Sequence, residues 1–139
     1  MNSILLIEDD VRFAEAFKAY AKRICSVEVV SVPSMLEAFA MLKLAEFSAI
    51  ALDLTLTDSE PRQTIAAIHR LDQFAPVIIV TGATGDAAGI MRNLSVINGA
   101  AAFIQKDHIG MGGWALAISI MLDAYLRRRA LKLKTDQAA

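Results

Sequence analysis

The chain has 139 residues, of which 55% are hydrophobic and 21% are charged, and its formal net charge at pH 7 is -1. This length predicts one domain with a buried core, and the composition excludes an intrinsically disordered protein. The charge is close to zero, so the chain lacks the basic excess that is typical of nucleic-acid-binding proteins.

Short apolar runs alternate with longer segments of helical pattern along the chain. In chain order, the expected elements are strand 4–7, helix 11–24, strand 27–32, helix 34–46, strand 49–54, helix 62–74, strand 77–81, helix 86–98, strand 101–105 and helix 114–133. Ser34 and Glu37 form an S-x-x-E capping box at the start of the second helix. Asn98 and Gly99 are a stop signal for the fourth helix.

The five expected strands are near-continuous apolar runs rather than alternating ones. Such strands are buried on both faces, as in a parallel sheet covered by helices. Right-handed crossovers then place helices on both sides of the sheet. We therefore predict an α/β fold, a three-layer, doubly wound, five-stranded parallel sheet with the flavodoxin-like strand order 2-1-3-4-5.

The N-terminus and the single cysteine bear on location. Acidic residues follow the first apolar run at once, which argues against a signal peptide. The longest apolar stretch, 114–126, is too short to span a bilayer and contains Asp123. Cys25 is the only cysteine, so an internal disulfide is excluded. We expect a cytoplasmic protein with neither a membrane nor a nucleic acid as partner.

Polar residues stand at the ends of four of the strands, where ligands of such sheets bind. They are Glu8, Asp9, Asp10, Asp53, Thr81 and Lys106. Carboxylates crowded together repel each other unless a cation is present, and Mg²⁺ prefers oxygen ligands. An aspartate can also act as a nucleophile and form an aspartyl-phosphate, whose oxygens a metal, an ammonium and a hydroxyl then stabilise.

Each of these residues also has an ordinary structural interpretation. Asp10 could simply cap the following helix, Thr81 is a common strand residue, and an isolated lysine such as Lys106 is usually solvated. Asp53 is different because it lies in an otherwise apolar run, and burying an unpaired carboxylate costs several kcal/mol. A structural role for Asp53 would require a partner, and the candidates are Lys106 and Thr81.

These motifs resemble the receiver domains of bacterial two-component systems, including the stand-alone chemotaxis regulators, from about residue 3 to residue 127. The matching segments are ILLIEDD, LDLTLTD, IIVTG and FIQK. The resemblance implies that Asp53 accepts a phosphoryl group from a phosphohistidine of a sensor kinase or a histidine phosphotransfer protein. It also implies Mg²⁺ as cofactor, bound by Asp9 and Asp53, by the main-chain carbonyl of Thr55, and by Glu8 through water.

The same resemblance assigns a switch. Lys106 would bind the phosphoryl group, Thr81 would move toward it, and Phe103 would turn inward. The face made by the fourth helix, the fifth strand and the fifth helix would then be repacked for a partner. The protein would not be an enzyme, beyond catalysing its own phosphoryl transfer and hydrolysis. An alternative for Phe103 is a fixed aromatic residue of the core.

The chain departs from the common receiver pattern in three places. Asp107 follows Lys106 where many receivers have a proline, so a cis peptide bond is not expected there. The segment TDSEPRQ, after the third strand, lacks the glycine that is common near Glu60 and Pro61. Thr55 and Ala83, the positions that flank the attacking water in receivers, are both small.

The last helix carries apolar residues almost all round. They are Trp114, Leu116, Ile118, Ile120, Met121, Leu122, Tyr125 and Leu126. A helix on a sheet needs one apolar stripe, so the excess predicts a second buried face, against a twin chain or another partner. A broad-faced helix in a small domain is the alternative. We divide the chain into a receiver domain, 1–127, and a C-terminal extension, 128–139, too short for an output domain.

Two other classes of function remain as alternatives. A pseudo-receiver would keep the fold and act as a binding or dimerisation module without phosphorylation. A flavodoxin-like protein that binds a nucleotide or a flavin is disfavoured, because the acidic EDD segment after the first strand would repel phosphate.

Overall fold

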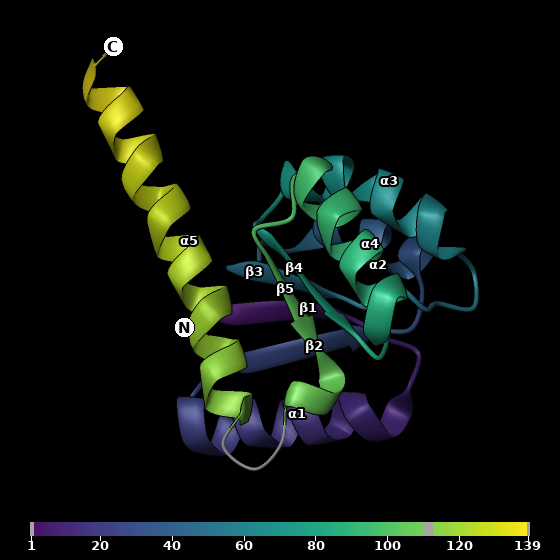
Figure 1. The fold of residues 1–139 in the computed structure, drawn as a ribbon. Coiled ribbons are helices and arrows are strands. Elements are labelled where there is room, and N and C mark those ends of the chain that lie inside the picture. Colours follow the sequence, from purple (N-terminus) through teal and green to yellow (C-terminus); the bar gives the residue numbers. More distant parts are fainter. Residues whose placement is uncertain (1, 110–112, 139) are drawn as a thin grey trace.

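The computed structural model describes residues 2–109 and 113–138 (Figure 1). Its elements are β1 Ser3–Ile7, α1 Val11–Cys25, β2 Glu28–Val32, α2 Met35–Leu44, β3 Ala49–Leu52, α3 Pro61–Asp72, β4 Val77–Thr81, α4 Gly85–Ile97, β5 Ala102–Gln105 and α5 Gly113–Ala138. All strand pairs are parallel, and the order is β2-β1-β3-β4-β5. The predicted fold class and strand order are confirmed.

Most boundaries lie within two residues of the predicted ones, and three of the differences bear on the site and on the last helix. β3 ends at Leu52 rather than at residue 54, because the Asp53 carboxylate accepts the N–H of Thr55 and the chain turns into a loop. α3 begins at Pro61, since a proline in the first turn of a helix leaves no intrahelical hydrogen bond unmade. α5 continues to Ala138, five residues beyond its predicted end.

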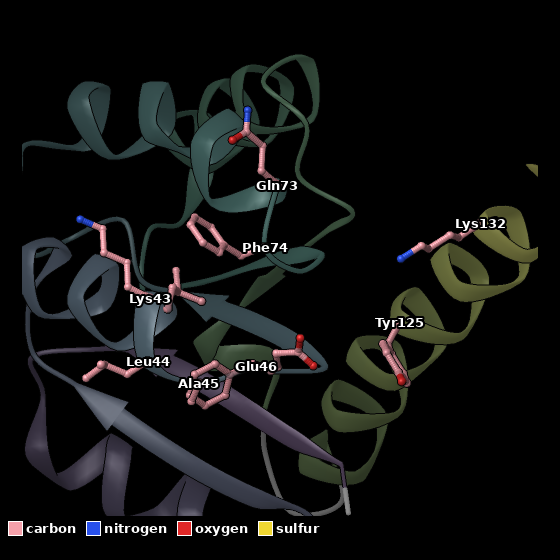
Figure 2. A pocket seen from close by; sticks show the side chains of 10 residues that line it. Lys43, Leu44, Ala45, Glu46, Gln73, Phe74, Tyr125 and Lys132 are labelled. Atoms are coloured by element: carbon pink, nitrogen blue, oxygen red, sulfur yellow. The ribbon is translucent and has the colours of Figure 1, made fainter. Parts of the chain in front are cut away.

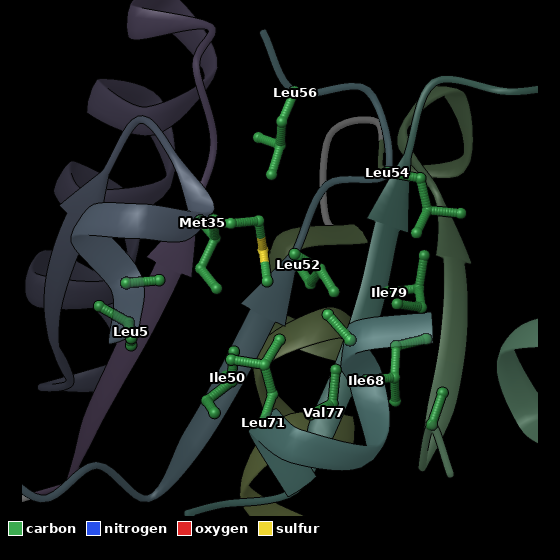
Figure 3. Close-up of a cluster of buried hydrophobic side chains, with 14 of the residues drawn as sticks. Leu5, Met35, Ile50, Leu52, Leu54, Leu56, Ile68, Leu71, Val77 and Ile79 are labelled. Carbon is green, nitrogen blue, oxygen red and sulfur yellow. The ribbon is translucent and has the colours of Figure 1, made fainter. Parts of the chain in front are cut away.

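The sheet is covered on both faces, as Figure 1 shows. Helices α2, α3 and α4 cover one face, and α1 and α5 cover the other. Successive side chains of a strand point to opposite faces, so each strand contributes to two separate cores. In β3, Ile50 and Leu52 belong to the core on the face that α2, α3 and α4 cover, which we call the α2–α3 core (Figure 3). Ala49 and Ala51 belong to the core under α1 and α5, which we call the α1–α5 core. Burial on both faces explains the continuous apolar runs.

Side chains cap the helices next to the carboxyl edge of the sheet. Asp10 caps α1, its Oδ1 accepting the N–H groups of Arg12 and Phe13 at 3.0 and 3.3 Å. Ser34 caps α2, its Oγ accepting the N–H of Glu37 at 3.2 Å, as the capping-box motif predicted.

The end of α4 depends on a glycine. Gly99 has φ +106°, a conformation that other residues rarely adopt.

α5 has 26 residues and therefore extends about 39 Å. Its first half packs on the sheet through Ala117, Ile118 and Met121, which are buried. Leu116 and Leu126 are 65% and 60% exposed, so the helix has apolar side chains on both sides. Residues 128–138, which we call the C-terminal arm, extend past the edge of the sheet (Figure 1). Within the described ranges, no helix is long and apolar enough to cross a membrane.

Candidate functional site

The register of β1 and β3 places two carboxylates side by side. Ile7 pairs with Leu52, and the N–H of Asp53 donates to the carbonyl of Ile7 at 3.0 Å. Glu8 and Asp53 directly follow β1 and β3, so they lie side by side at the carboxyl edge of the sheet. Both side chains are almost fully buried, each residue being 3% exposed. Two adjacent, buried carboxylates require a cation or protons to be stable.

Asp9 completes an acidic cluster with these two residues. One carboxylate oxygen from each of Glu8, Asp9 and Asp53 lies within 4.8 Å of the others. Asp9 is half-buried, so solvent reaches the cluster from its side. Oxygen ligands that converge at this spacing are suited to a hard divalent cation such as Mg²⁺.

Lys106 supplies the one ammonium that contacts the cluster among the described residues. It directly follows β5 and begins a short 3₁₀ turn, Lys106–His108. Its Nζ lies 2.6 Å from Oε2 of Glu8 and 3.5 Å from Oδ2 of Asp53. Three carboxylates against one ammonium leave a net negative charge, which a bound cation would neutralise.

Glu8 has an unusual protonation equilibrium. Burial raises its pKa from an ordinary value of 4.5 to about 7. The nearby Lys106 ammonium and the N–H of Asp10 partly oppose this shift, and the negative charge of Asp53 adds to it. Apart from its ion pair with Lys106, the buried Oε2 of Glu8 accepts no hydrogen bond from the described part of the chain. This orphaned oxygen and the hard oxygen donors around it fit a divalent cation.

The loop after β3 holds Asp53 in place. Oδ1 of Asp53 accepts the N–H of Thr55 at 3.1 Å, while Oδ2 faces Lys106. Lys106 is thus the partner that the sequence suggested for this buried carboxylate, and the Thr55 N–H is a second one that the sequence did not indicate. Both oxygens of Asp53 have a fixed neighbour before any ligand binds.

Thr81 and Phe103 lie on the α4 side of the sheet. Phe103 pairs with Ile79, and Thr81 pairs with Gln105, so all four side chains face the same way. The hydroxyl of Thr81 is fully buried and accepts the N–H of Ala83 at 3.3 Å. Phe103 is half-buried, with the Arg92 guanidinium 5.4 Å from its ring centre.

The comparisons with known proteins agree with this geometry. The family described as the response regulator receiver domain matches residues 4–109. The chain belongs to this family. Receiver domains are the response-regulator modules of two-component signalling, so the resemblance inferred from the sequence motifs is confirmed.

Solved structures of receiver domains share the fold. A CheY-like receiver domain protein from Methanospirillum hungatei JF-1 is 23% identical, with a TM-score of 0.76 over 92% of this chain and 98% of that one. The signal receiver domain of a LuxO repressor protein from Vibrio parahaemolyticus is 22% identical, with a TM-score of 0.76 over 94% and 96%. The Mn²⁺-bound response regulator Rcp1 is 20% identical, with a TM-score of 0.69 over 86% and 91%. Among curated proteins, no sequence match is found.

The receiver contains contacts that the sequence motifs did not indicate. Asp58, in the loop after β3, accepts the N–H groups of Met35 and Leu36 at 3.2 and 3.4 Å and so caps α2 together with Ser34. The Lys106 ammonium lies over the face of the Phe13 ring. Asp10, for which capping and ligand roles were both open, caps α1. The peptide bond between Lys106 and Asp107 is trans, as predicted from the missing proline.

A separate cavity of about 650 Å³ lies at the opposite edge of the sheet (Figure 2). Phe74, from the loop that leads into β4, lines one side, and Tyr125 and Lys132 of α5 line the other. Phe47, from the loop that leads into β3, also lines the cavity. None of the candidate site residues borders this cavity. The acidic cluster is therefore a distinct site at the carboxyl edge.

Proposed function

We propose that this receiver accepts a phosphoryl group on Asp53 from a phosphohistidine of a sensor kinase or a histidine phosphotransfer protein. A carboxylate oxygen of Asp53 bonds to phosphorus as the phosphorus–nitrogen bond breaks, and the electron pair leaves with the imidazole nitrogen. The observation that carries the proposal is the placement of buried Asp53 between two other carboxylates and the Lys106 ammonium. Its own turnover is limited to this transfer and to hydrolysis of the aspartyl-phosphate.

Mg²⁺ is the proposed cofactor. Asp9 and Asp53 would bind it directly with the carbonyl of Thr55, and Glu8 would act through water. When bound, the ion neutralises the crowded carboxylates and the developing charge on the phosphoryl oxygens. A fold neighbour, Rcp1, was solved with Mn²⁺ bound, which supports divalent-cation binding at this fold. Lys106 would hold a phosphoryl oxygen through its ammonium.

The test is the intact mass of the protein after incubation with Mg²⁺ and acetyl phosphate or phosphoramidate. We expect a gain of one phosphoryl group that requires Mg²⁺ and is absent from Asp53→Asn. The matched control is Asp10→Asn, which removes a neighbouring charge but keeps a good N-cap residue for α1. A folded wild-type protein that gains no mass would instead assign the chain to receivers that act as binding modules without phosphorylation.

We propose Thr81 and Phe103 as the switch that responds to the phosphoryl group. They share the α4 side of the sheet, and the adjoining face of α4 exposes Ile90, Leu94 and Ile97 at helical spacing. A protein partner that contacts α4, β5 and α5 would cover these side chains. Amide hydrogen exchange should change at this face when Mg²⁺ and beryllium fluoride, a phosphoryl analogue, are added. Thr81→Ala should abolish the change, and Thr81→Ser should retain it.

We also propose a homodimer through α5. Leu126, Ala130 and Leu133 are exposed at positions i, i+4 and i+7, the spacing of a helix–helix seam. Residues 129–137 are all exposed, which supports treating the C-terminal arm as an extension of the receiver domain. Sedimentation equilibrium over a range of concentrations should show a dimer that Leu126→Gln with Leu133→Gln weakens. Leu36→Gln, at a leucine of α2 that is still more exposed, is the control.

We propose a cytoplasmic location for this receiver. The single Cys25 is unpaired in the chain, as is common for proteins in a reducing compartment. Fractionation of the cells that express the protein would test this location.

A further inference from the structure

The Lys106 ammonium has an aromatic neighbour in addition to the two carboxylates. Its Nζ lies 4.3 Å from the centre of the Phe13 ring, in the first turn of α1. A cation this close to the face of an aromatic ring is attracted by the ring's quadrupole, most strongly where water is partly excluded. The Lys106 side chain is 20% exposed. Phe13 therefore helps to decide where this ammonium lies.

Phe13 also packs against Trp114, in the first turn of α5. The two ring centres are 5.2 Å apart with an interplanar angle of 39°. Two further aromatic residues of α1 surround the same indole, Phe17 at 5.3 Å and Tyr20 at 6.2 Å. Of these three α1 residues, Phe13 is the one whose ring contacts the Lys106 ammonium. Phe13 is thus a bridge between the acidic cluster and α5.

This bridge lies on a different side of the sheet from the proposed switch. Phe13 and Trp114 pack with the α1–α5 core, whereas Phe103 packs with the α2–α3 core. Anything that changes the position of the Lys106 ammonium, such as a new anion at Asp53, changes its attraction to the Phe13 ring. Because protein interiors are closely packed, a shift of that ring displaces its neighbour Trp114.

We propose that Phe13 is a positioning residue for the Lys106 ammonium and couples that ammonium to α5 through Trp114. The phosphoryl-dependent part of this inference rests on the proposed function of Asp53 and Lys106. The coupling itself exists before any phosphoryl group arrives, so it can be tested on the unmodified protein.

The first experiment is a mutant cycle read by tryptophan fluorescence, since Trp114 is the only tryptophan of the chain. Lys106→Met removes the ammonium and keeps most of the side-chain length. We expect this substitution to shift the Trp114 emission when Phe13 is present and to leave it unchanged in the Phe13→Leu background. An equal shift in both backgrounds, or no shift in either, would overturn the coupling.

The second experiment measures the rate of Mg²⁺-dependent phosphorylation by a small phosphodonor, read by intact mass. Phe13→Leu should lower the rate about 3- to 10-fold, the size expected for losing one cation–π contact. Phe13→Tyr keeps the ring face and should restore the rate. Tyr20→Leu removes another ring next to Trp114 without touching the lysine and should leave the rate unchanged.

The two experiments separate the failure of this inference from the failure of the proposed function. If the wild-type protein gains no phosphoryl group, the proposed function is wrong, and the fluorescence cycle still decides the coupling. If the wild type is phosphorylated but Phe13→Leu has the wild-type rate, the positioning role of Phe13 is refuted. If Tyr20→Leu lowered the rate as much as Phe13→Leu does, both losses would come from disturbed packing around Trp114. That result would also refute the positioning role of Phe13.

Discussion

Arg128 of α5 contacts Asp72, the last residue of α3, through both the carboxylate and the main chain of that residue. Its Nη1 donates to the carbonyl of Asp72 at 2.6 Å, and its Nη2 pairs with Oδ1. The last carbonyls of a helix lack intrahelical partners, and the negative end of the helix dipole favours a nearby cation. This contact joins the start of the C-terminal arm to the body of the receiver.

Arg128→Met should lower the free energy of unfolding by about 1 kcal/mol, because it removes a charge-assisted hydrogen bond and a half-exposed ion pair. Urea denaturation measures the change. Arg127→Met is the control, since Arg127 pairs with Asp123 on the exposed surface of the same helix and should cost under about 0.5 kcal/mol. Equal costs for the two variants would mean that the contact with Asp72 adds nothing.

Asp58→Ala should destabilise the protein by about 1 kcal/mol, because the N–H groups of Met35 and Leu36 lose their acceptor at the start of α2. Asp58→Asn retains a single acceptor oxygen, so its cost should be smaller. The neighbouring, exposed Thr57→Ala serves as control. The contribution of Asp58 would be disproved if all three variants unfolded at the same urea concentration.

Mg²⁺ should raise the melting temperature of the wild-type receiver, because an ion that binds only the folded state stabilises it. At ten times its dissociation constant the gain is about 1.4 kcal/mol, and a chelator should reverse it. Asp9→Asn and Asp53→Asn should each lose most of this gain. Asp10→Asn should keep it, since Asp10 caps α1 and is not part of the acidic cluster. A gain that survives in Asp53→Asn would place the ion elsewhere.

The stability of the metal-free protein should depend on pH through Glu8. Its pKa is about 7 in the folded state and near 4.5 when the chain is unfolded. The folded state therefore keeps a proton that the unfolded state loses, and the stability contributed by neutral Glu8 is lost as pH rises from about 4.5 through about 7. Glu8→Gln has no such loss, so it should gain stability relative to wild type by roughly 1–3 kcal/mol between pH 5 and pH 8.

The measurement for Glu8 is urea denaturation of both proteins at pH 5 and pH 8 in the presence of a chelator. Saturating Mg²⁺ at pH 8 is the control, because the ion stabilises the charged form of wild-type Glu8 and should shrink the difference. A difference between the two proteins that is the same at both pH values would contradict the raised pKa.

The helix boundaries illustrate how far local sequence patterns reach. Ser34 and Glu37 predicted the start of α2, and Asn98 with Gly99 predicted the end of α4, because each signal acts within one helical turn. The predicted end of β3 was two residues too late. The apolar run continues through Leu54, but that side chain is buried in the loop rather than in the strand.

The sequence by itself determined the sheet, its strand order and the polar residues at the carboxyl edge, because strands buried on both faces must be apolar throughout and their ends must not be. Only the tertiary structure decided which groups meet. The β1–β3 register brings Glu8 beside Asp53, and helix packing brings Phe13 to Lys106 and Arg128 to Asp72. These partners lie dozens of residues apart in the chain, so no local period or motif encodes their contact. The contact arises only when the helices pack against the sheet.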